Sequence, residues 1–273
     1  VRGAVGISII EPALRRLGHE VLALPTVLLS SHPGHALSAG LWLPPERLAA
    51  MVEALDANGW LAGLDAVLTG YLPSRDHVLL AGSAIERIRR ASPDVLVVCD
   101  PVLGDDPKGL YIDRAAAEAI RDDLLPRATL ATPNRFELAF LTGRTVAGID
   151  DAARALMCLP CGGGVATSIP AAAASGLANV AALDDCIAAT RVVRRDVAPH
   201  GTGDLLAAVL LHGLVAGDAP AAALARATAA TDAALDASAG QDVLRLPAVL
   251  DQSLTWPVEN WSRGATAAPP GAN

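Results

Sequence analysis

The sequence has few aromatic residues, no excess of positive charge and no long apolar run. Phe, Trp and Tyr make up 3% of its 273 residues, so alanine, leucine and valine must fill most of the core. The formal net charge of -8 argues against nucleic acid or an anionic membrane as the main partner. No apolar run reaches the ~18 residues of a membrane span, and the N-terminus lacks a signal-peptide pattern.

Cysteine is also scarce. Four cysteines in a chain of this length do not make a disulfide framework. Cys158 and Cys161 form a single CxxC pair without a second pair, which is a weak indication of metal or redox chemistry. This usage favours a reduced protein in the cytoplasm.

Short β-branched runs alternate with longer helical patterns along the chain. The sequence predicts strands at 20–29, 65–69, 94–99, 128–131, 164–167 and 179–183, and helices at 44–57, 74–91, 114–125, 134–141 and 150–157. This alternation predicts an α/β fold whose parallel sheet carries helices on both faces. Ligands of such sheets bind beyond the carboxyl ends of the strands. We predict one domain over 1–255 and a disordered tail at 256–273, which is rich in proline, glycine and alanine.

Acidic side chains follow two of the predicted strands. Asp100 comes directly after VLVVC and before a proline turn, where it could hold a hydrated divalent cation or belong to a plain turn. Glu137 lies three residues after Asn134, a spacing typical of a capping box. If the two strands are neighbours, Asp100 and Glu137 would converge on Mg²⁺, which proteins hold through one or two acids and water. Both interpretations stay open for this pair.

The motif HGTGD opens a strongly apolar helix pattern. The turn Gly201-Thr202-Gly203 lets successive N–H groups point outward at the positive end of the helix, which suits an anion. Asp204 could merely cap this helix. With a phosphate bound there, Asp204 could instead orient a substrate hydroxyl and accept its proton. Phosphoryl transfer depends mainly on such positioning and on charge stabilisation.

Five motifs occur in order with compatible spacing: PTVLLSSHPGH, GYLPS, DPVLGD with KGLY downstream, TPNRFELAFLTG and HGTGD. Together they resemble the pyridoxal kinases of the ribokinase superfamily over nearly the whole chain, up to about residue 250. The resemblance implies a ribokinase-like three-layer sandwich with a mostly parallel central sheet. It also implies ATP-dependent phosphorylation of the 5′-hydroxymethyl group of pyridoxal in vitamin B6 salvage. Mg²⁺ and a homodimer are implied as well, and a monovalent cation is left open.

The resemblance assigns roles residue by residue. Asp204 matches the catalytic base, and Gly201 and Gly203 shape its anion hole. Pyridoxal is implied to lie against Asp204, Ser31, His32, Pro33 and Gly34, although His32 could equally be an ordinary loop histidine. The ATP side is implied to comprise Asp100, Tyr111, Thr132, Glu137, Thr167, Val197, Ala198, Pro199, His200 and Thr202, with Asp100 and Glu137 next to the metal. Tyr111 matches a loop that closes over the site and excludes water.

The sequence departs from the family pattern at its beginning. The family opens with a buried strand, whereas VRGAVGISIIEPALRRLG matches only the turn and helix that follow, with Ile7 and Ile9 at usually polar positions. Val1 is then either a misassigned start or a real truncation. A central strand buries about three or four apolar side chains at ~1.5–3 kcal/mol each. We therefore expect the chain from Val1 to fold poorly or be inactive and an upstream-extended chain to be stable, which melts and kinase assays would compare.

A second departure is the glycine run 162–164 before a predicted strand. Glycine weakens strands, which puts the implied contact of Thr167 in question.

Other functions remain open. Hydroxymethylpyrimidine kinases of the superfamily share the DP and TPN features but typically carry cysteine after the GTG turn. Sugar kinases lack the SSHPGH and TPNRFE patterns. From a different class, a non-catalytic pyridoxal-phosphate-binding protein would bind its ligand without turnover. Formation of the phosphate ester from pyridoxal, ATP and Mg²⁺ separates these alternatives.

Overall fold

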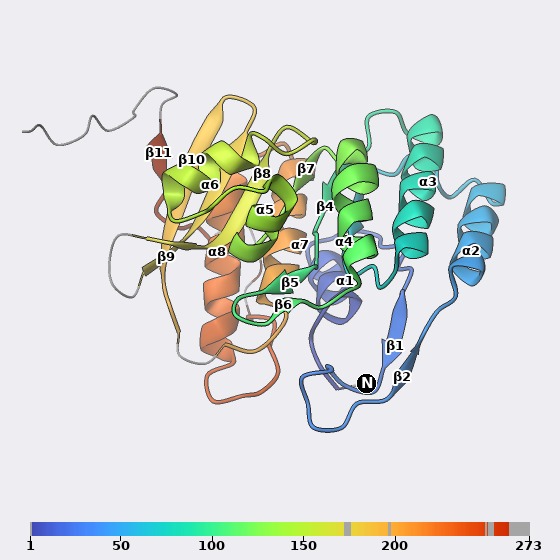
Figure 1. Cartoon of the computed structure of the whole chain (residues 1–273), viewed down its shortest axis with the longest axis horizontal. Coiled ribbons are helices and arrows are strands. Elements are labelled where there is room, and N and C mark those ends of the chain that lie inside the picture. Colours follow the sequence, from blue (N-terminus) through green and yellow to red (C-terminus); the bar gives the residue numbers. More distant parts are fainter. Residues whose placement is uncertain (1, 172–175, 196–197, 249, 251–253, 262–273) are drawn as a thin grey trace, which may run out of the picture.

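The computed structural model describes residues 2–171, 176–195, 198–248, 250 and 254–261. Its centre is a seven-stranded sheet in the order β11-β10-β9-β8-β7-β4-β3 (Figure 1). Four neighbouring strands are parallel: β3 (Ala66–Thr69), β4 (Leu96–Cys99), β7 (Leu130–Ala131) and β8 (Gly164–Pro170). The sheet continues antiparallel through β9 (Gly176–Leu183), β10 (Cys186–Val193) and β11 (Glu259–Trp261).

Helices cover both faces of this sheet. One face carries α2 (Pro45–Ala57), α3 (Arg75–Ala91), α4 (Arg114–Ala119), α5 (Arg135–Thr142) and α6 (Ile149–Leu156), and the other carries α1 (Ile7–Arg16), α7 (Thr202–Val215) and α8 (Pro220–Ala237). The side chains of β4 alternate between the two apolar clusters: Val97 and Cys99 join the first, and Val98 joins the second. The predicted three-layer α/β sandwich is therefore confirmed.

Small side chains allow the layers to approach closely. From Leu205 to Gly213 every residue of α7 is buried, as its unbroken apolar pattern requires. A Cβ added at Gly213 would lie 3.0 Å from the Cβ of Ala223 on α8. Because the core is rich in alanine and poor in aromatic residues, the helices lie close together and leave little space between them. None of the helices in the described residues is long and apolar enough to cross a membrane.

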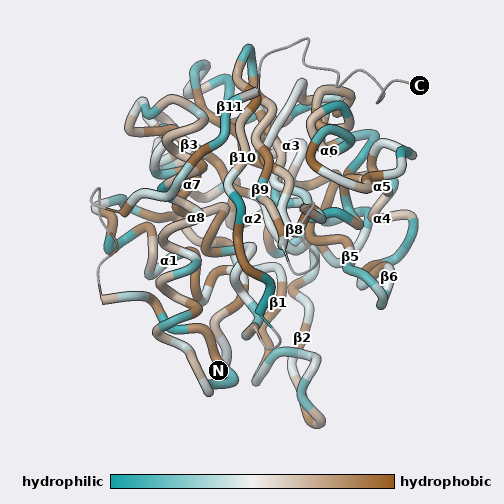
Figure 2. Tube along the Cα trace, turned by 90° about the vertical axis from the view of Figure 1, so that its left-hand side faces the viewer, coloured by the Kyte–Doolittle hydropathy of each residue, from teal (hydrophilic) through white to brown (hydrophobic). Residues whose placement is uncertain are grey.

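The predicted elements are mostly present, with four corrections. Of the strand expected at 20–29, only Val27–Leu29 forms (β1), and it pairs antiparallel with β2 (Gly40–Trp42) in a separate hairpin that projects from the body (Figures 1 and 2). The helix expected at 114–125 ends at Ala119 and continues as a π-helical turn at Ile120–Leu124. Strand β10 and helix α8 were not predicted.

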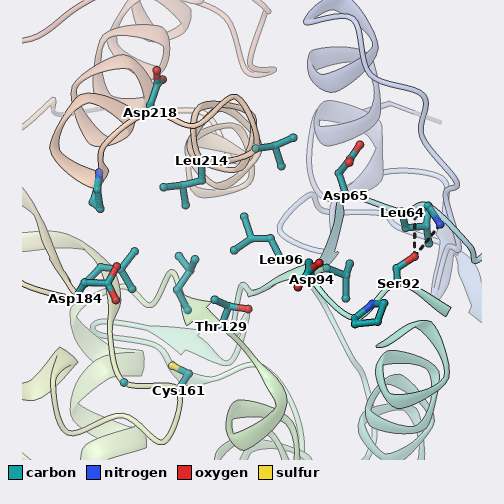
Figure 3. A pocket seen from close by; sticks show the side chains of 18 of the residues that line it. Leu64, Asp65, Ser92, Asp94, Leu96, Thr129, Cys161, Asp184, Leu214 and Asp218 are labelled. Atoms are coloured by element: carbon teal, nitrogen blue, oxygen red, sulfur yellow. Dashed lines mark hydrogen bonds between the residues drawn. The ribbon is translucent and has the colours of Figure 1, made fainter. Parts of the chain in front are cut away.

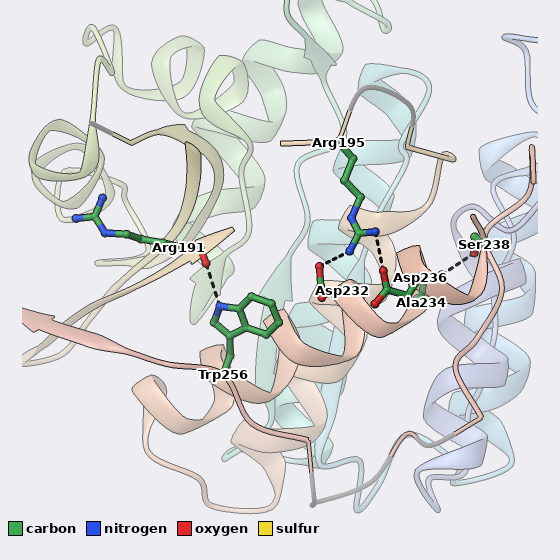
Figure 4. A network of polar contacts seen from close by, with 7 residues as sticks. All are labelled: Arg191, Arg195, Asp232, Ala234, Asp236, Ser238 and Trp256. Atoms are coloured by element: carbon green, nitrogen blue, oxygen red, sulfur yellow. Dashed lines mark hydrogen bonds and ion pairs between the residues drawn. The ribbon is translucent and has the colours of Figure 1, made fainter. Parts of the chain in front are cut away.

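The C-terminal segment supplies the third correction. Disorder was expected from residue 256, but β11 pairs with β10, so this expectation is wrong for Glu259–Trp261. The indole N–H of Trp256 also donates to the carbonyl oxygen of Arg191 at 3.0 Å (Figure 4). The folded domain therefore extends past residue 255, and residues 262–273 lie outside the described part.

The fourth correction concerns the glycine run before β8. A Cβ at Gly163 would lie 2.3 Å from the carbonyl oxygen of Ala182, and one at Gly164 would lie 2.0 Å from that of Ala131. These glycines let the chain enter between β7 and β9 where no side chain fits. The glycines do not prevent the strand, because β8 forms over the seven residues Gly164–Pro170.

Candidate active site

Two neighbouring strands deliver the first polar pair. Cys99 of β4 is in register with Ala131 of β7, so the residues that follow, Asp100 and Thr132, emerge side by side. Both are buried, and the Thr132 hydroxyl donates to Oδ1 of Asp100 at 2.9 Å. The condition on which convergence of Asp100 and Glu137 depended, that the strands be neighbours, is confirmed.

Glu137 has a structural role as well as a place near Asp100. The backbone N–H of Asn134 donates to its Oε2 at 2.8 Å, and its own N–H donates to Oδ1 of Asn134 at 3.0 Å, which completes a capping box on α5. Its Oε1 accepts from the N–H groups of Leu103 at 3.0 Å and Gly104 at 3.5 Å. Burial raises the pKa of Glu137 to about 7, against these hydrogen bonds, which lower it. The carboxylate therefore holds a helix start and the following hairpin together.

Asp204 completes a group of three carboxylates. It lies in the first turn of α7, and burial raises its pKa, while a hydrogen bond from the backbone N–H of Gly6 opposes that rise. The pKa of Asp100 is raised well above its usual range, first by burial and then by the charges of Asp204 and Glu137. Asp204 and Glu137, from separate segments, thus both act on Asp100 at the carboxyl end of β4, where a cation would relieve the repulsion.

The glycine turn before Asp204 has two different glycines. Gly201 adopts φ 100° as the N-cap of α7, and a Cβ there would lie 1.8 Å from the carbonyl oxygen of Ala4. Both the left-handed backbone and this close approach require glycine. A Cβ at Gly203 would meet no atom within 4 Å. Gly203 is exposed next to Thr202, so this side of the turn is open to a ligand.

A hairpin borders the carboxylates. It consists of β5 (Gly104–Asp105) and β6 (Gly109–Leu110), and the side-chain amide of Asn134 donates to the Gly104 carbonyl at 2.8 Å. Tyr111 follows it, with its side chain partly exposed. Burial and the nearby Asp105 carboxylate raise the pKa of Tyr111 above its usual range. Oδ1 of Asp105 is buried, so this carboxylate is not an ordinary solvated loop charge.

The segment expected to border pyridoxal lies in the loop between β1 and β2. The hydroxyl of Ser31 donates to the Leu37 carbonyl at 3.1 Å, and the Gly34 N–H donates to Nδ1 of His32 at 3.0 Å. The His32 ring stacks on the ring of His200, with centroids 3.9 Å apart and planes at 21°. Pro33 lies between these anchored residues. The segments that the sequence assigns to pyridoxal and to ATP therefore touch at the two histidines.

The rest of the expected nucleotide side is less tightly grouped. Ala198 is exposed and Pro199 is half-buried just before His200, while Val197 lies outside the described residues. Thr167 bridges to Asn134, and its N–H donates to the Pro133 carbonyl at 2.9 Å, which places it beside the start of α5.

The sequence could not have indicated three contacts in this region. They are the Gly6 N–H on Asp204, the Asp105 carboxylate beside Tyr111, and the ring stack of His32 on His200. Each joins segments that are far apart in the chain or separated by a turn. A histidine directly before a GTG turn and another in a predicted ligand loop were the only available signals for the stack.

The structure also has a hollow that lies away from Asp100, Glu137 and Asp204. It has a volume of about 850 Å³ and lies beside the amino-terminal ends of the parallel strands, near Asp65, Leu96 and Leu130 (Figure 3). Parallel sheets bind their ligands at the opposite, carboxyl ends. None of the expected site residues lines this hollow.

Comparison with known proteins agrees with this geometry. The family model described as phosphomethylpyrimidine kinase matches residues 41–245. The pyridoxine/pyridoxal/pyridoxamine kinase of Bordetella avium is 41% identical over 225 residues, covering 80% of this chain and 75% of the relative. Pyridoxal kinase PdxY of Deinococcus radiodurans is 34% identical over 219 residues, covering 76% and 73%.

Solved structures show the same fold. Pyridoxal kinase from Leishmania donovani in complex with ADP and pyridoxamine superposes with a TM-score of 0.88 at 28% identity, covering 96% of each chain. A putative phosphomethylpyrimidine kinase from Bacteroides thetaiotaomicron, in a crystal form with pyridoxal, gives a TM-score of 0.77 at 25% identity, covering 87% of this chain and 84% of that one. The fold is thus that of a ribokinase-like kinase. The chain belongs to the phosphomethylpyrimidine kinase family, among the pyridoxal kinases.

Proposed function

We propose that the protein transfers the γ-phosphoryl group of ATP to the 5′-hydroxymethyl group of pyridoxal, giving pyridoxal 5′-phosphate and ADP. The observation that carries this proposal is the position of Asp204. It is a partly buried carboxylate behind a glycine turn, at the positive end of α7 and close enough to Asp100 for the two charges to interact. Relatives at 41% and 34% identity carry pyridoxal kinase names, which supports the same substrate.

In this proposal Asp204 accepts the proton of the pyridoxal hydroxyl as that oxygen forms its bond to the γ-phosphorus. The bond between the γ-phosphorus and the bridging oxygen breaks, and ADP leaves with the electron pair. The raised pKa of Asp204 makes it a stronger base than an exposed aspartate. Backbone N–H groups at Gly201 to Gly203 would face the transferred phosphoryl group and stabilise its charge.

We also propose a magnesium ion held largely through water, because the described residues contain no group of three acids, histidines or cysteines that could ligate a metal directly. Asp100 has one oxygen bound by Thr132, whereas both oxygens of Glu137 already accept backbone N–H groups. We therefore propose Asp100 as the nearer ligand and Glu137 as a partner through water. Bound Mg²⁺ would offset the negative charge of the phosphates. Thr132, Thr167, Tyr111, Thr202 and residues 197–200 are proposed to line the nucleotide, and Ser31, His32, Pro33 and Gly34 to line pyridoxal.

The test replaces Asp204 by asparagine, which keeps the shape and removes the base. We expect kcat for pyridoxal to fall by at least about 100-fold, in keeping with the usual contribution of general-base catalysis, with pyridoxal binding retained. Asp76→Asn is the matched control, because Asp76 is an exposed acid in the first turn of α3. An Asp204→Asn enzyme with unchanged kcat would refute the proposal. Binding of pyridoxal by the unaltered protein without phosphate-ester formation would instead favour a carrier.

The family description leaves hydroxymethylpyrimidine as the second substrate to assay. Because aspartate rather than cysteine follows the GTG turn, we expect kcat/KM to be higher for pyridoxal. Side-by-side assays of both alcohols decide between them, and a higher value for hydroxymethylpyrimidine would overturn the assignment.

We further propose that the protein is a cytoplasmic homodimer. Leu28 and Leu41 lie opposite each other in the β1–β2 hairpin, and each leaves half or more of its side chain exposed, at 50% and 54%. Exposed aliphatic pairs on a projecting hairpin are suited to burial against another subunit. We propose that a second copy of this chain covers these two side chains.

A further inference from the structure

The loop that is proposed to border pyridoxal has a defined contact with the lead-in to the catalytic helix. We call residues 30–39 the substrate loop. Its base is closed by a hydrogen bond from the Ser30 N–H to the Ala39 carbonyl at 2.7 Å, and its ends continue into the projecting β1–β2 hairpin. Within this loop, His32 lies against His200, the residue directly before Gly201. The stack therefore connects a projecting element to the fixed start of α7.

The His32 ring is held by a hydrogen bond, and the His200 ring stacks on it. Nδ1 of His32 accepts the Gly34 N–H at 3.0 Å, which fixes the ring and requires that Nδ1 carry no proton. His200 precedes Gly201, whose backbone packs against the Ala4 carbonyl. A Cβ at Gly34 would lie 2.9 Å from Nδ1 of His32 and 3.5 Å from Nε2 of His200, so Gly34 lies close to both rings. The two rings are therefore a direct contact between the two segments.

Building on the proposed function, we propose that His32 and His200 form a positioning pair through which the substrate loop and the phosphate-facing turn hold each other in place. Filling either site then orders the other, so pyridoxal and nucleotide bind with positive coupling. Aromatic pairs of this kind contribute about two- to tenfold in affinity beyond simple burial.

The pair also depends on pH. Burial lowers the pKa of His32 first, and the electrostatic effects of His200, His35 and Lys108 lower it further. The pKa of His200 is lowered by burial, Lys108 and His35, whereas Asp105 opposes this shift. Both rings are therefore neutral above about pH 6.5. Acid would charge the rings, and protonation at Nδ1 of His32 would also break its bond from Gly34.

The decisive measurement is the affinity for Mg²⁺ and AMP-PNP without pyridoxal, which requires no turnover. His32 is not among the proposed nucleotide contacts, yet we expect His32→Ala to weaken AMP-PNP binding about two- to tenfold. We expect His200→Ala to raise KM for pyridoxal by a similar factor. The double variant should be no worse than the more affected single variant, because each change removes the same contact. Additive effects, or unchanged AMP-PNP affinity in His32→Ala, would overturn the proposal.

Two further variants separate stacking from charge. His200→Phe keeps an aromatic ring without a titrating group, so we expect wild-type coupling at pH 7.5 and a smaller loss of affinity at pH 5.5. His35→Ala removes a neighbouring cation but leaves the stack, so its coupling at pH 7.5 should match the wild type. An NMR titration should show a higher pKa for His32 in His200→Phe than in the wild type. A His200→Phe variant that behaves like His200→Ala would contradict the role of the rings.

These outcomes are distinct from a failure of the proposed function. If the unaltered protein did not phosphorylate pyridoxal, the proposed function would fail, whereas the AMP-PNP affinities and the His32 titration would still report on the pair.

Discussion

At the scale of single residues, the two glycines of the HGTGD motif have different tasks. Gly201 is fixed by its positive φ and by the Ala4 carbonyl, whereas a side chain at Gly203 would meet open space. The motif alone treats them alike, because both read as glycines of an anion-binding turn. Only the position of the N-terminal segment against Gly201 distinguishes them.

This difference predicts opposite phenotypes for two alanine variants. Gly201→Ala should destabilise the fold by at least about 2 kcal/mol, which lowers Tm by roughly 4–8 °C in a domain of this size. Gly203→Ala should leave Tm within about 1 °C but raise KM for ATP, because its Cβ would point toward the incoming phosphate. Thermal melts and ATP titrations of the pair test this. Equal Tm values for both variants would show that the Ala4 contact is unimportant.

The three carboxylates predict a pH-dependent response to magnesium. The pKa of Glu137 is raised to about 7 from the usual 4.5, so its contribution to stability is present in acid and is lost as the pH rises through about 7. Mg²⁺ should offset the repulsion that then appears. We expect the rise in Tm on adding Mg²⁺ to be larger at pH 8 than at pH 6, and to shrink in Asp100→Asn. A rise that is independent of pH would argue against a cation between these acids.

At the scale of elements, an ion-pair clamp fixes the chain that leads to the nucleotide side. Arg195, just beyond β10, donates to Asp232 at 2.6 Å and to Asp236 at 2.7 Å, one turn apart on α8 (Figure 4). Partly exposed pairs of this kind contribute only about 0.2–1 kcal/mol each to stability. Their effect on the position of residues 198–200 should therefore exceed their effect on folding.

We accordingly expect Arg195→Ala to raise KM for ATP about two- to fivefold, with a small change in Tm, and a similar rise to appear in the wild type at high salt. Arg191→Ala is the matched control, because Arg191 pairs with Glu259 on β11 and lies on the strand rather than on the lead-in to α7. Steady-state kinetics at two salt concentrations measure both effects. The same KM for ATP in Arg195→Ala and Arg191→Ala would show that the Arg195 ion pairs do not contribute to nucleotide binding.

Prediction from sequence succeeded best for elements with strong local patterns. The runs around β3 and β4 are continuously apolar, and α2, α3 and α5 begin within one residue of their predicted starts. It failed where tertiary contacts decide. Only three residues of 20–29 form a strand, because their partner β2 is short. The glycines before β8 indicate a weak strand locally, although the neighbouring backbones require them there.

The candidate site follows the same division. Placement of Asp100 and Thr132 at carboxyl ends was predictable because each directly follows a predicted strand, whereas the adjacency of those strands was a condition that only the structure met. The capping box was predictable from its spacing. Contacts such as Gly6 with Asp204 depend on how α1 packs against α7, which no local pattern encodes.

At the scale of the whole molecule, the proposed dimer can be tested by substitutions in the projecting β1–β2 hairpin. Leu41→Glu should place a charge in the proposed subunit contact and shift the protein toward monomer in sedimentation velocity. Met157→Glu is the control, because Met157 is also an exposed apolar residue (43%) but lies after α6. A wild-type protein that sediments as a monomer, or a Leu41→Glu variant that stays dimeric, would exclude this surface.

Glu137 has both a structural role and an electrostatic role, and this combination limits how substitutions can inactivate the enzyme. One side chain starts α5, fastens the hairpin before Tyr111 and adds charge beside Asp100. Replacing it would loosen the scaffold at the same time as it altered the chemistry, so a well-folded but inert protein is not expected from that position. Inert yet intact forms should arise at Asp204 instead, whose carboxylate can be exchanged without removing a helix cap.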